Sequence, residues 1–208
     1  TETILRHIPM SYSDAVDRAR DGLKEVGVDP DRLNAYPHTF SGGMRQRVVI
    51  ALALAPEPSL IIADEPTTAL DVSVQAQILK LLKKLCLERG TSIILITHDM
   101  GVIAETTDRV AVLYAGRLAE IGFTQDVLKT PEHPYTRGLV ASTPNIATTA
   151  VAQILYQIPG TMPKLDAIPN GCAFHPRCFD ATQKCKSHRP ELFRNRTACW
   201  LHQDLGKS

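Results

Sequence analysis

The spacing of apolar residues changes several times along the first half of the chain. Residues 11–26 and 74–85 carry them at helical spacing, and a further helix is expected to begin at Ser41. Two short runs, 60–63 and 93–96, are continuously apolar and end in polar residues, which is typical of buried strands. A strand, a helix and a second strand in this order predict a βαβ unit, and therefore an α/β fold with a parallel sheet.

The periodic pattern weakens after a predicted hairpin. Residues 109–122 are expected to form two strands joined at Ala115–Gly116. From about Thr124 the chain is rich in proline and only weakly periodic, which predicts irregular structure lying over a surface. Four of the five cysteines also fall late, within the last 37 residues. This change in composition predicts a domain boundary near residues 123 and 124.

Length and composition are those of a folded protein with one domain and an appendage. The 208 residues are 44% hydrophobic and 22% charged, and the net charge is +1. This balance gives no bulk electrostatic reason for binding nucleic acid or a membrane surface. The longest apolar run, Val48–Ala55, is far too short to span a bilayer. Because the chain has neither a signal-like start nor an initiator Met, we expect part of a cytosolic protein.

Acidic residues follow the first predicted strand directly. Asp64 and Glu65 end it, and Thr97, His98 and Asp99 end the second strand. Ligands of open α/β sheets bind at the carboxyl ends of the strands. One carboxylate there can hold Mg²⁺, while the other orients a nucleophilic water. The acid pair alone leaves a second interpretation open, namely a strand followed by an ordinary helix-capping Asp.

Ser41, Gly42 and Gly43 stand where the next predicted helix begins. The free backbone N–H groups and the positive end of the helix dipole favour an anion at such a position. Glycine lets a phosphate approach closely because no Cβ intervenes. Ser-Gly-Gly is also an ordinary capping sequence, so this turn by itself does not decide between the two interpretations.

In combination, these elements resemble the ATP-binding subunits of ABC transporters. The resemblance rests on the order and separation of the Ser-Gly-Gly turn, an apolar helix, the strand, the acid pair and a later histidine. It implies a P-loop NTPase-like fold that binds ATP and Mg²⁺. It implies the following roles: Ser41, Gly42 and Gly43 as the signature motif, Asp64 as the Walker B aspartate, Glu65 as the general base, Asp71 in the D-loop, and His98 as the switch histidine at the γ-phosphate.

Longer stretches resemble the peptide/nickel branch of that family. They are IADEPTTALDVSVQAQIL, ITHDMGVIAE, HPYTRGL and the cysteine-bearing end GCAFHPRCFDATQKC. The resemblance implies an ATPase domain over 1–123, with a helical subdomain in about 1–56 and a catalytic core in about 57–123. Residues 124–208 would be the C-terminal extension of peptide transporters.

The same resemblance implies the assembly in which such a protein works. A second ABC ATPase subunit, identical or paralogous, and two transmembrane permease subunits would be its partners, with a peptide-binding protein acting indirectly and no nucleic acid. The implied cargo is a dipeptide, an oligopeptide or nickel. The location would be peripheral, at the cytoplasmic face of the plasma membrane.

No phosphate-binding loop of the form G-x-x-x-x-G-K-[ST] stands between a strand and a helix in this sequence. The one Gly-Lys-Ser, residues 206–208, has Leu201 in place of the first glycine and no following helix. We therefore expect the C-terminal part of an ATPase, which could complete a partner's nucleotide site but would not hydrolyse ATP alone. The alternative is a truncated, non-catalytic ABC module that acts through protein contacts of a metal-bound tail.

The clustered cysteines are Cys172, Cys178, Cys185 and Cys199. Their spacing matches neither a zinc ribbon nor a bacterial ferredoxin sequence, and spacing alone leaves Cys₄ zinc and an iron–sulfur cluster open. Disulfides are disfavoured because an ATPase must bind ATP in the cytosol, where cysteine thiols stay reduced. The resemblance to peptide-importer ATPases favours a [4Fe-4S] cluster, with a structural role.

Overall fold

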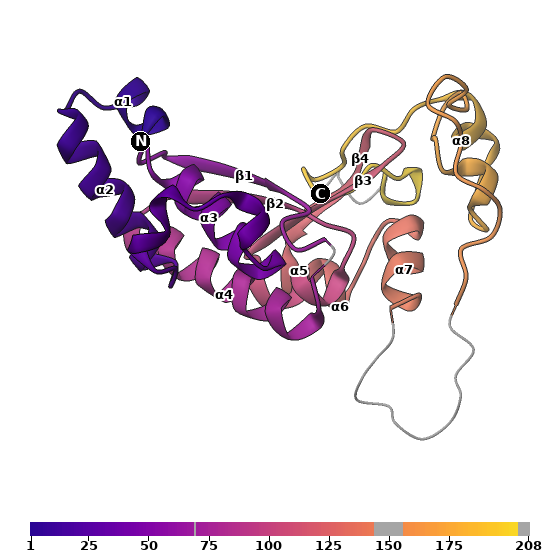
Figure 1. Ribbon diagram of the computed structural model, residues 1–208. Helices are drawn as coiled ribbons and strands as arrows, with labels where there is room; N and C mark the ends of the chain where they lie inside the picture. Colours follow the sequence, from indigo (N-terminus) through magenta and orange to yellow (C-terminus); the bar gives the residue numbers. More distant parts are fainter. Residues whose placement is uncertain (69, 144–155, 204–208) are drawn as a thin grey trace. The chain divides into compact units, whose positions relative to one another are not determined.

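The computed structural model describes residues 1–68, 70–143 and 156–203. The chain divides into two compact units, Thr1–His98 and Asp99–Ser208, each with its own hydrophobic core (Figure 1). The hairpin that was assigned to the ATPase domain by sequence lies in the second compact unit. The boundary near residue 123, which separates two kinds of sequence, stays a prediction.

The first unit contains the predicted βαβ arrangement. Its elements are α1 (Glu2–His7), α2 (Tyr12–Glu25), 3₁₀ turns at Pro30–Asn34 and Pro37–Thr39, α3 (Gly42–Leu54), β1 (Leu60–Asp64), α4 (Val72–Arg89) and β2 (Ser92–Ile96). Strands β1 and β2 pair in parallel, with Leu60 opposite Ser92 and Asp64 opposite Ile96. The parallel sheet predicted from the sequence is confirmed.

Helix ends in this unit follow local capping chemistry. The side chains of Ser11, Ser41 and Asp71 each accept a hydrogen bond from the backbone N–H three residues later, at the starts of α2, α3 and α4. Helix α4 ends at Gly90, which has a φ of 64° in the left-handed region. The predicted helix starts at Ser11 and Ser41 and the predicted stop at Gly90 are confirmed.

The core of the first unit forms between the helices and one face of the sheet. Its most deeply buried members include Val26, Val28, Leu54, Ile78 and Cys86, and Ile61 of β1 belongs to it as well. The opposite face of the sheet carries Leu60, Ile62, Ile94 and Ile96, all exposed; Ile62 is 64% accessible. Parallel sheets are ordinarily covered on both faces. The described residues therefore leave one apolar face of this sheet open.

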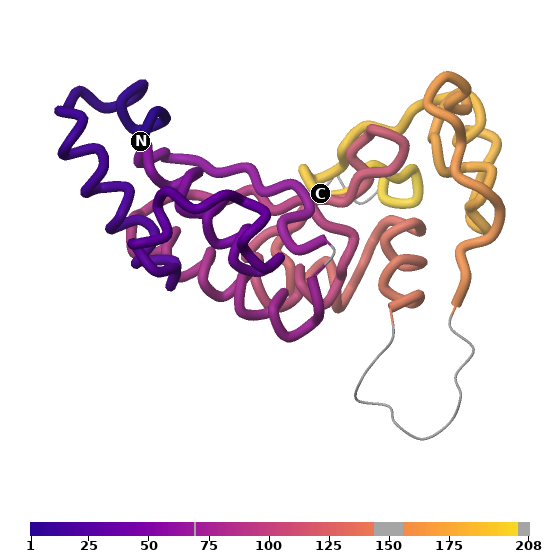
Figure 2. Tube along the Cα trace, viewed as in Figure 1, coloured from indigo at the N-terminus to yellow at the C-terminus, as the bar shows by residue number. Residues whose placement is uncertain are grey.

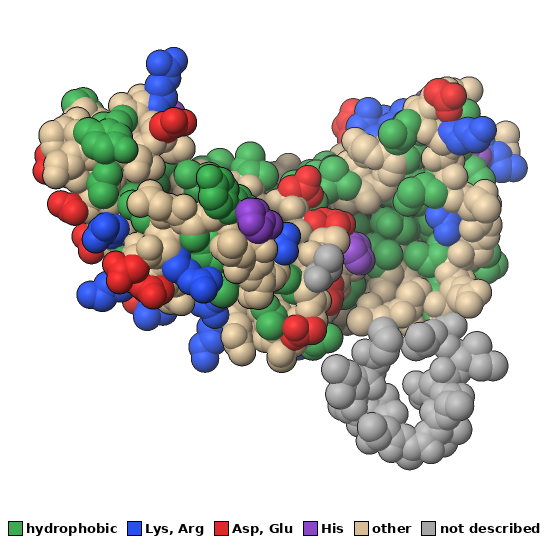
Figure 3. Space-filling model, viewed as in Figure 1, with side chains coloured by type: hydrophobic (Ala, Val, Ile, Leu, Met, Phe, Trp, Pro, Cys, Tyr) green, Lys and Arg blue, Asp and Glu red, His purple; other side chains and the backbone are tan. Residues whose placement is uncertain are grey.

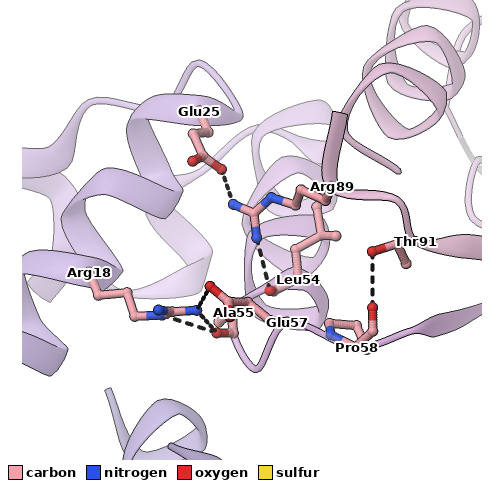
Figure 4. Close-up of polar contacts among 8 residues, drawn as sticks. All are labelled: Arg18, Glu25, Leu54, Ala55, Glu57, Pro58, Arg89 and Thr91. Atoms are coloured by element: carbon pink, nitrogen blue, oxygen red, sulfur yellow. Dashed lines mark hydrogen bonds and ion pairs between the residues drawn. The ribbon is translucent and has the colours of Figure 1, made fainter. Parts of the chain in front are cut away.

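Two arginines hold the end of α3 (Figure 4). Arg18 of α2 donates to the carbonyl oxygen of Ala55 at 3.0 and 3.3 Å, and Arg89 of α4 donates to that of Leu54 at 3.1 Å. Carbonyls at a helix end have no partner within the helix and carry the negative end of its dipole, so cations stabilise them. Both guanidinium groups also form ion pairs, Arg18 with Glu57 and Arg89 with Glu25.

The second unit contains an antiparallel hairpin and several short helices. Its elements are α5 (Met100–Thr106), β3 (Arg109–Tyr114), β4 (Arg117–Phe123), α6 (Thr124–Lys129), α7 (Pro134–Ala141), α8 (Gln183–Ser187) and 3₁₀ turns at His175–Arg177 and Trp200–His202. Ala115 and Gly116 join the strands with φ angles of 48° and 71°. Positive φ at both positions is the geometry of a type I′ hairpin turn, and the predicted hairpin is confirmed.

The prediction of irregular structure from Thr124 onward is wrong for α6, which follows β4 directly, and for α7, which follows after a short connection (Figure 2). These helices bury few apolar side chains: α6 buries Thr124 and Val127, and α7 buries Tyr135, Thr136 and Gly138. Threonine and glycine do not count as apolar residues when helical spacing is sought in a sequence. The hydrophobic pattern therefore could not reveal these two helices.

The molecular surface agrees with the near-neutral composition. Acidic and basic side chains are interspersed on the face drawn in Figure 3, with hydrophobic side chains between them. Across the part of the chain that is described, no helix has both the length and the apolar character needed to cross a membrane.

Candidate functional site

The end of β1 presents two acids to solvent. Asp64 is the last residue of the strand, and Glu65 follows it with a φ of 43°. The backbone N–H of Glu65 donates to the carbonyl oxygen of Ile96 at 2.9 Å, which extends the pairing with β2 by one residue. A left-handed conformation at a residue other than glycine costs on the order of 1 kcal/mol, and such conformations are concentrated at functional positions.

The carboxylate of Glu65 has a partner on each oxygen. His98 Nδ1 lies 2.9 Å from Oε1, and the hydroxyl of Thr68 donates to Oε2 at 2.9 Å. These two hydrogen bonds, that to His98 first, hold the pKa of Glu65 below its ordinary value. The two residues expected to be catalytic, Glu65 and His98, therefore meet, although their roles stay predictions. Sequence reasoning missed Thr68, which a hydroxyl three residues after the acid could have indicated.

Asp71 is the N-cap of helix α4 in this structure. It accepts from the backbone N–H of Val74 at 2.9 Å and from the hydroxyl of Ser73 at 2.7 Å. These bonds lower the pKa of the Asp71 carboxyl, that from Val74 having the largest effect. Its assignment to the D-loop remains a prediction.

The Ser-Gly-Gly turn opens α3 as expected. Ser41 Oγ accepts from the backbone N–H of Met44 at 3.3 Å. A Cβ on Gly42 would lie 3.3 Å from Leu70 Cδ2, and one on Gly43 would lie 2.8 Å from Val74 Cγ1. The sequence suggested that these glycines serve a phosphate. The structure adds a packing reason, since the first turn of α3 lies directly against that of α4.

All four clustered cysteines, Cys172, Cys178, Cys185 and Cys199, line one small cavity in the second unit. The backbone N–H of Cys172 donates to the carbonyl oxygen of Cys185 at 2.8 Å, which joins two segments of the cluster. Burial raises the pKa of the thiols of Cys172 and Cys178, and that of Cys199 to about 11. A thiolate in this cavity would therefore need positive charge beside it.

The sequence suggested two metal groups for the four cysteines, a single zinc ion or an iron–sulfur cluster. No group of three or more His, Cys, Asp or Glu side chains in the described ranges is placed to hold a metal ion. The described residues thus do not form a single-ion site of the Cys₄ zinc type, in which all sulfurs bond one atom. A [4Fe-4S] cluster takes each cysteine on a separate iron, so it needs four cysteines around one cavity, as these are, and it stays a prediction.

His133 lies on the wall of the same cavity and is 3% exposed. Its Nδ1 accepts from the backbone N–H of Tyr135 at 3.0 Å, at the start of α7. Burial, with smaller contributions from Arg137 and His202, lowers the pKa of His133 to about 4, so its ring is neutral at physiological pH. Sequence reasoning gave this histidine no chemical role, because no metal-ligand spacing surrounds it.

Two family models match this chain. Residues 1–68 match the model described as ABC transporter. Residues 119–185 match the model described as oligopeptide/dipeptide transporter, C-terminal region.

Curated relatives match almost the whole chain. The dipeptide transport ATP-binding protein DppD of Bacillus subtilis is 48% identical over 96% of this chain and 61% of its own length. The oligopeptide transport ATP-binding protein OppD of the same organism is 50% identical over 100% and 60%. The probable D,D-dipeptide transport ATP-binding protein DdpD of Escherichia coli is 46% identical over 97% and 63%. The chain therefore spans about three fifths of the length of these relatives.

Solved structures share the fold. The protein cbiO1 of Clostridium perfringens, part of the ABC transporter complex cbiONQ, has a TM-score of 0.54 and is 31% identical, over 61% of this chain and 50% of that one. A metal-chelate type ABC transporter in an inward-facing conformation has a TM-score of 0.52 and is 28% identical, over 58% and 46%. The α/β fold of ABC ATPase domains, expected from the sequence, is confirmed.

Proposed function

The chain belongs to the ATP-binding proteins of oligopeptide and dipeptide ABC transporters, and we propose that it forms part of the energy-coupling ATPase of a peptide importer. The observation that carries this proposal is the presence, on one chain, of an ABC transporter match and a match to the C-terminal region of peptide transporters. Nickel is the alternative cargo, because none of the predicted ATP-site residues selects what is carried.

The acids at the end of β1 would act on ATP. Asp64 would hold Mg²⁺, which neutralises phosphate charge when bound. Glu65 would be the general base, since it ends the strand beside Asp64 and its carboxylate is ionised at neutral pH, so it can accept a proton from an attacking water. His98, whose Nδ1 lies 2.9 Å from Glu65 Oε1, would orient that base and contact the γ-phosphate.

The Ser41-Gly42-Gly43 turn would act on a second nucleotide, held by the partner ATPase subunit. Its position at the start of a 13-residue helix supports this role, because backbone N–H groups and the positive dipole end are directed at an anion there. Asp71, which begins α4 beside this turn, would lie in the D-loop at the same interface.

The 208 residues contain no phosphate-binding loop of the usual form to accompany Asp64, Glu65 and His98. We infer that the chain does not hydrolyse ATP alone and that the longer protein does. The apolar face of Leu60, Ile62, Ile94 and Ile96 supports this inference, because a covered sheet would require further structure there.

The assembly would comprise a second ATPase subunit and two transmembrane permease subunits, with a peptide-binding protein acting indirectly. The chain would then lie peripherally at the cytoplasmic face of the plasma membrane. In the second unit, the four cysteines would hold a [4Fe-4S] cluster, which would join segments that otherwise contain only the short helix α8 and two 3₁₀ turns. Its role would be structural.

ATP turnover by this chain, alone and mixed with a complete partner ATPase subunit, tests the proposal. We expect none alone, and a changed rate on mixing. Two variants make the test specific. Glu65→Gln removes the base, and Ser41→Asp keeps a good N-cap while placing negative charge where phosphate would bind. The effect of mixing should be lost with Ser41→Asp.

Two results would contradict parts of the proposal. Turnover by the chain alone that depends on Glu65 would show that the nucleotide site is complete without a P-loop of the usual form. A mixture that behaves as the sum of its parts, with no response to Ser41→Asp, would favour the alternative function. That alternative is a non-catalytic module that acts through protein contacts of its C-terminal segment.

A further inference from the structure

The cavity lined by the four cysteines contains a polar group that the proposed function does not use. This group is the imidazole of His133, which is almost fully buried on the cavity wall. Another histidine of the same wall, His175, has its Nδ1 engaged at 2.9 Å with the carbonyl oxygen of Cys172. Asp180, also on the wall, is half exposed and paired with Arg137.

The backbone around His133 is held by a buried acid. Glu120 of β4 has no exposed surface, and its two carboxylate oxygens accept the backbone N–H groups of Glu132 and His133, each at 2.9 Å. Helix α7 then begins at Pro134, with the His133 side chain capping the N–H of Tyr135. These bonds fix both the position of His133 and the orientation of its ring.

This capping bond also determines where the ring proton lies. Because Nδ1 accepts a hydrogen bond from an amide, a neutral ring must carry its proton on Nε2. The hydrogen bonds within the described part of the chain include none donated by Nε2. This N–H is not among the fully buried atoms that lack a partner, so it keeps some accessible surface although the residue is only 3% exposed. Sulfur that carries negative charge is an acceptor that the four cysteines of the same cavity can supply.

We propose that His133 is a positioning residue whose Nε2–H donates a hydrogen bond to a sulfur atom of the group held by the four cysteines. This inference rests on the proposed iron–sulfur cluster. Hydrogen bonds to the sulfurs of such a cluster stabilise its more negative, reduced form and so raise its reduction potential. The buried cap at the start of α7 would thus link the fold of the second unit to the chemistry of the cavity.

The test uses the full chain, reconstituted anaerobically with iron and sulfide. His133→Asn is the informative variant, because asparagine is a strong N-cap that can accept from Tyr135 but is too short to place a donor where Nε2 lies. His188→Asn is the matched control, since His188 is exposed in the same unit. Iron and sulfide content, visible absorption and a redox titration followed by electron paramagnetic resonance are the readouts.

We expect His133→Asn to retain the cluster at a lower reduction potential, with His188→Asn unchanged. An unchanged potential at full iron content would overturn the inference but leave the cluster intact. No iron or sulfide in the unsubstituted protein would overturn the cluster and the inference together. Should His133→Asn lose the cluster, protein labelled with ¹⁵N-histidine decides. A ¹⁵N coupling to the reduced cluster supports the hydrogen bond, and its absence refutes it.

Discussion

Replacement of Gly43 by alanine tests whether the Ser-Gly-Gly turn is shaped by packing within its own chain. The new Cβ would lie 2.8 Å from Val74 Cγ1, well inside the separation of about 3.5 Å at which two carbon atoms attract. Val74 cannot easily move aside, because a β-branched side chain on a helix has one strongly preferred rotamer.

The expected cost follows from two opposing effects. Overpacking of this kind destabilises by about 1–3 kcal/mol, while replacing glycine by alanine in a helix recovers up to about 1 kcal/mol. Gly43→Ala should therefore lower the free energy of unfolding of the first unit by about 1–2 kcal/mol. In a Val74→Ala background the clash disappears, and the same change should become neutral or slightly stabilising.

Hydrogen exchange of the α3 amides measures this effect in the first unit alone, whereas a denaturation curve would mix the two units. Gly22→Ala is the matched control, because Gly22 lies inside α2 with nothing within 4 Å of its added Cβ. It should stabilise by about 0.5–1 kcal/mol. The reasoning is refuted if Gly43→Ala costs the same with and without Val74.

Two further predictions concern single contacts. Thr68→Val removes a hydrogen bond that lowers the pKa of Glu65, so that pKa should rise toward its ordinary value of 4.5 in a carboxyl NMR titration. Stability due to this bond is present above pH 4.5 and is lost as the pH falls through the lowered pKa, so the variant should lose less stability on acidification. Gly171→Ala should destabilise the cysteine segment by more than about 1 kcal/mol, because its Cβ would lie 2.3 Å from the Cys185 carbonyl oxygen. Gly90→Ala, with a similar positive φ and no neighbour within 4 Å, isolates the backbone strain when hydrogen exchange is measured at the amides around each site, and an equal cost for both would refute the clash.

The parts of the fold that the sequence revealed are those determined by local chemistry. Ser11 and Ser41 could be recognised as helix starts because capping requires a short polar side chain there. The strands were visible because β1 and β2 are short apolar runs that end in polar residues. The sequence placed Glu65 and His98 at the ends of neighbouring parallel strands, which lie at the same edge of a sheet, but it did not predict their hydrogen bond.

The features that escaped prediction depend on contacts between distant segments. Helices α6 and α7 exist because the chain around them buries threonine and glycine, which no apolar period reports. The role of Gly43 depends on Val74, more than thirty residues later in the chain. The position of His133 on the cavity lined by the four cysteines depends on buried Glu120, which accepts the backbone N–H of His133. The spacing of residues along the sequence does not show which distant residues come into contact in the fold.

Helix α3 is attached to α4 at both ends. At its start, Gly43 lies against Val74 in the first turn of α4, and at its end Leu54 is held by Arg89 in the last turn of α4. Helix α4 in turn begins only seven residues after Glu65. Interiors packed this closely transmit displacement instead of absorbing it. A phosphate that shifts the Ser-Gly-Gly turn must therefore also shift the first turn of α4, which follows the segment that carries the base. In the proposed dimer, a nucleotide bound by the partner subunit would in this way reach the Glu65 side of this chain through contacts that are already present.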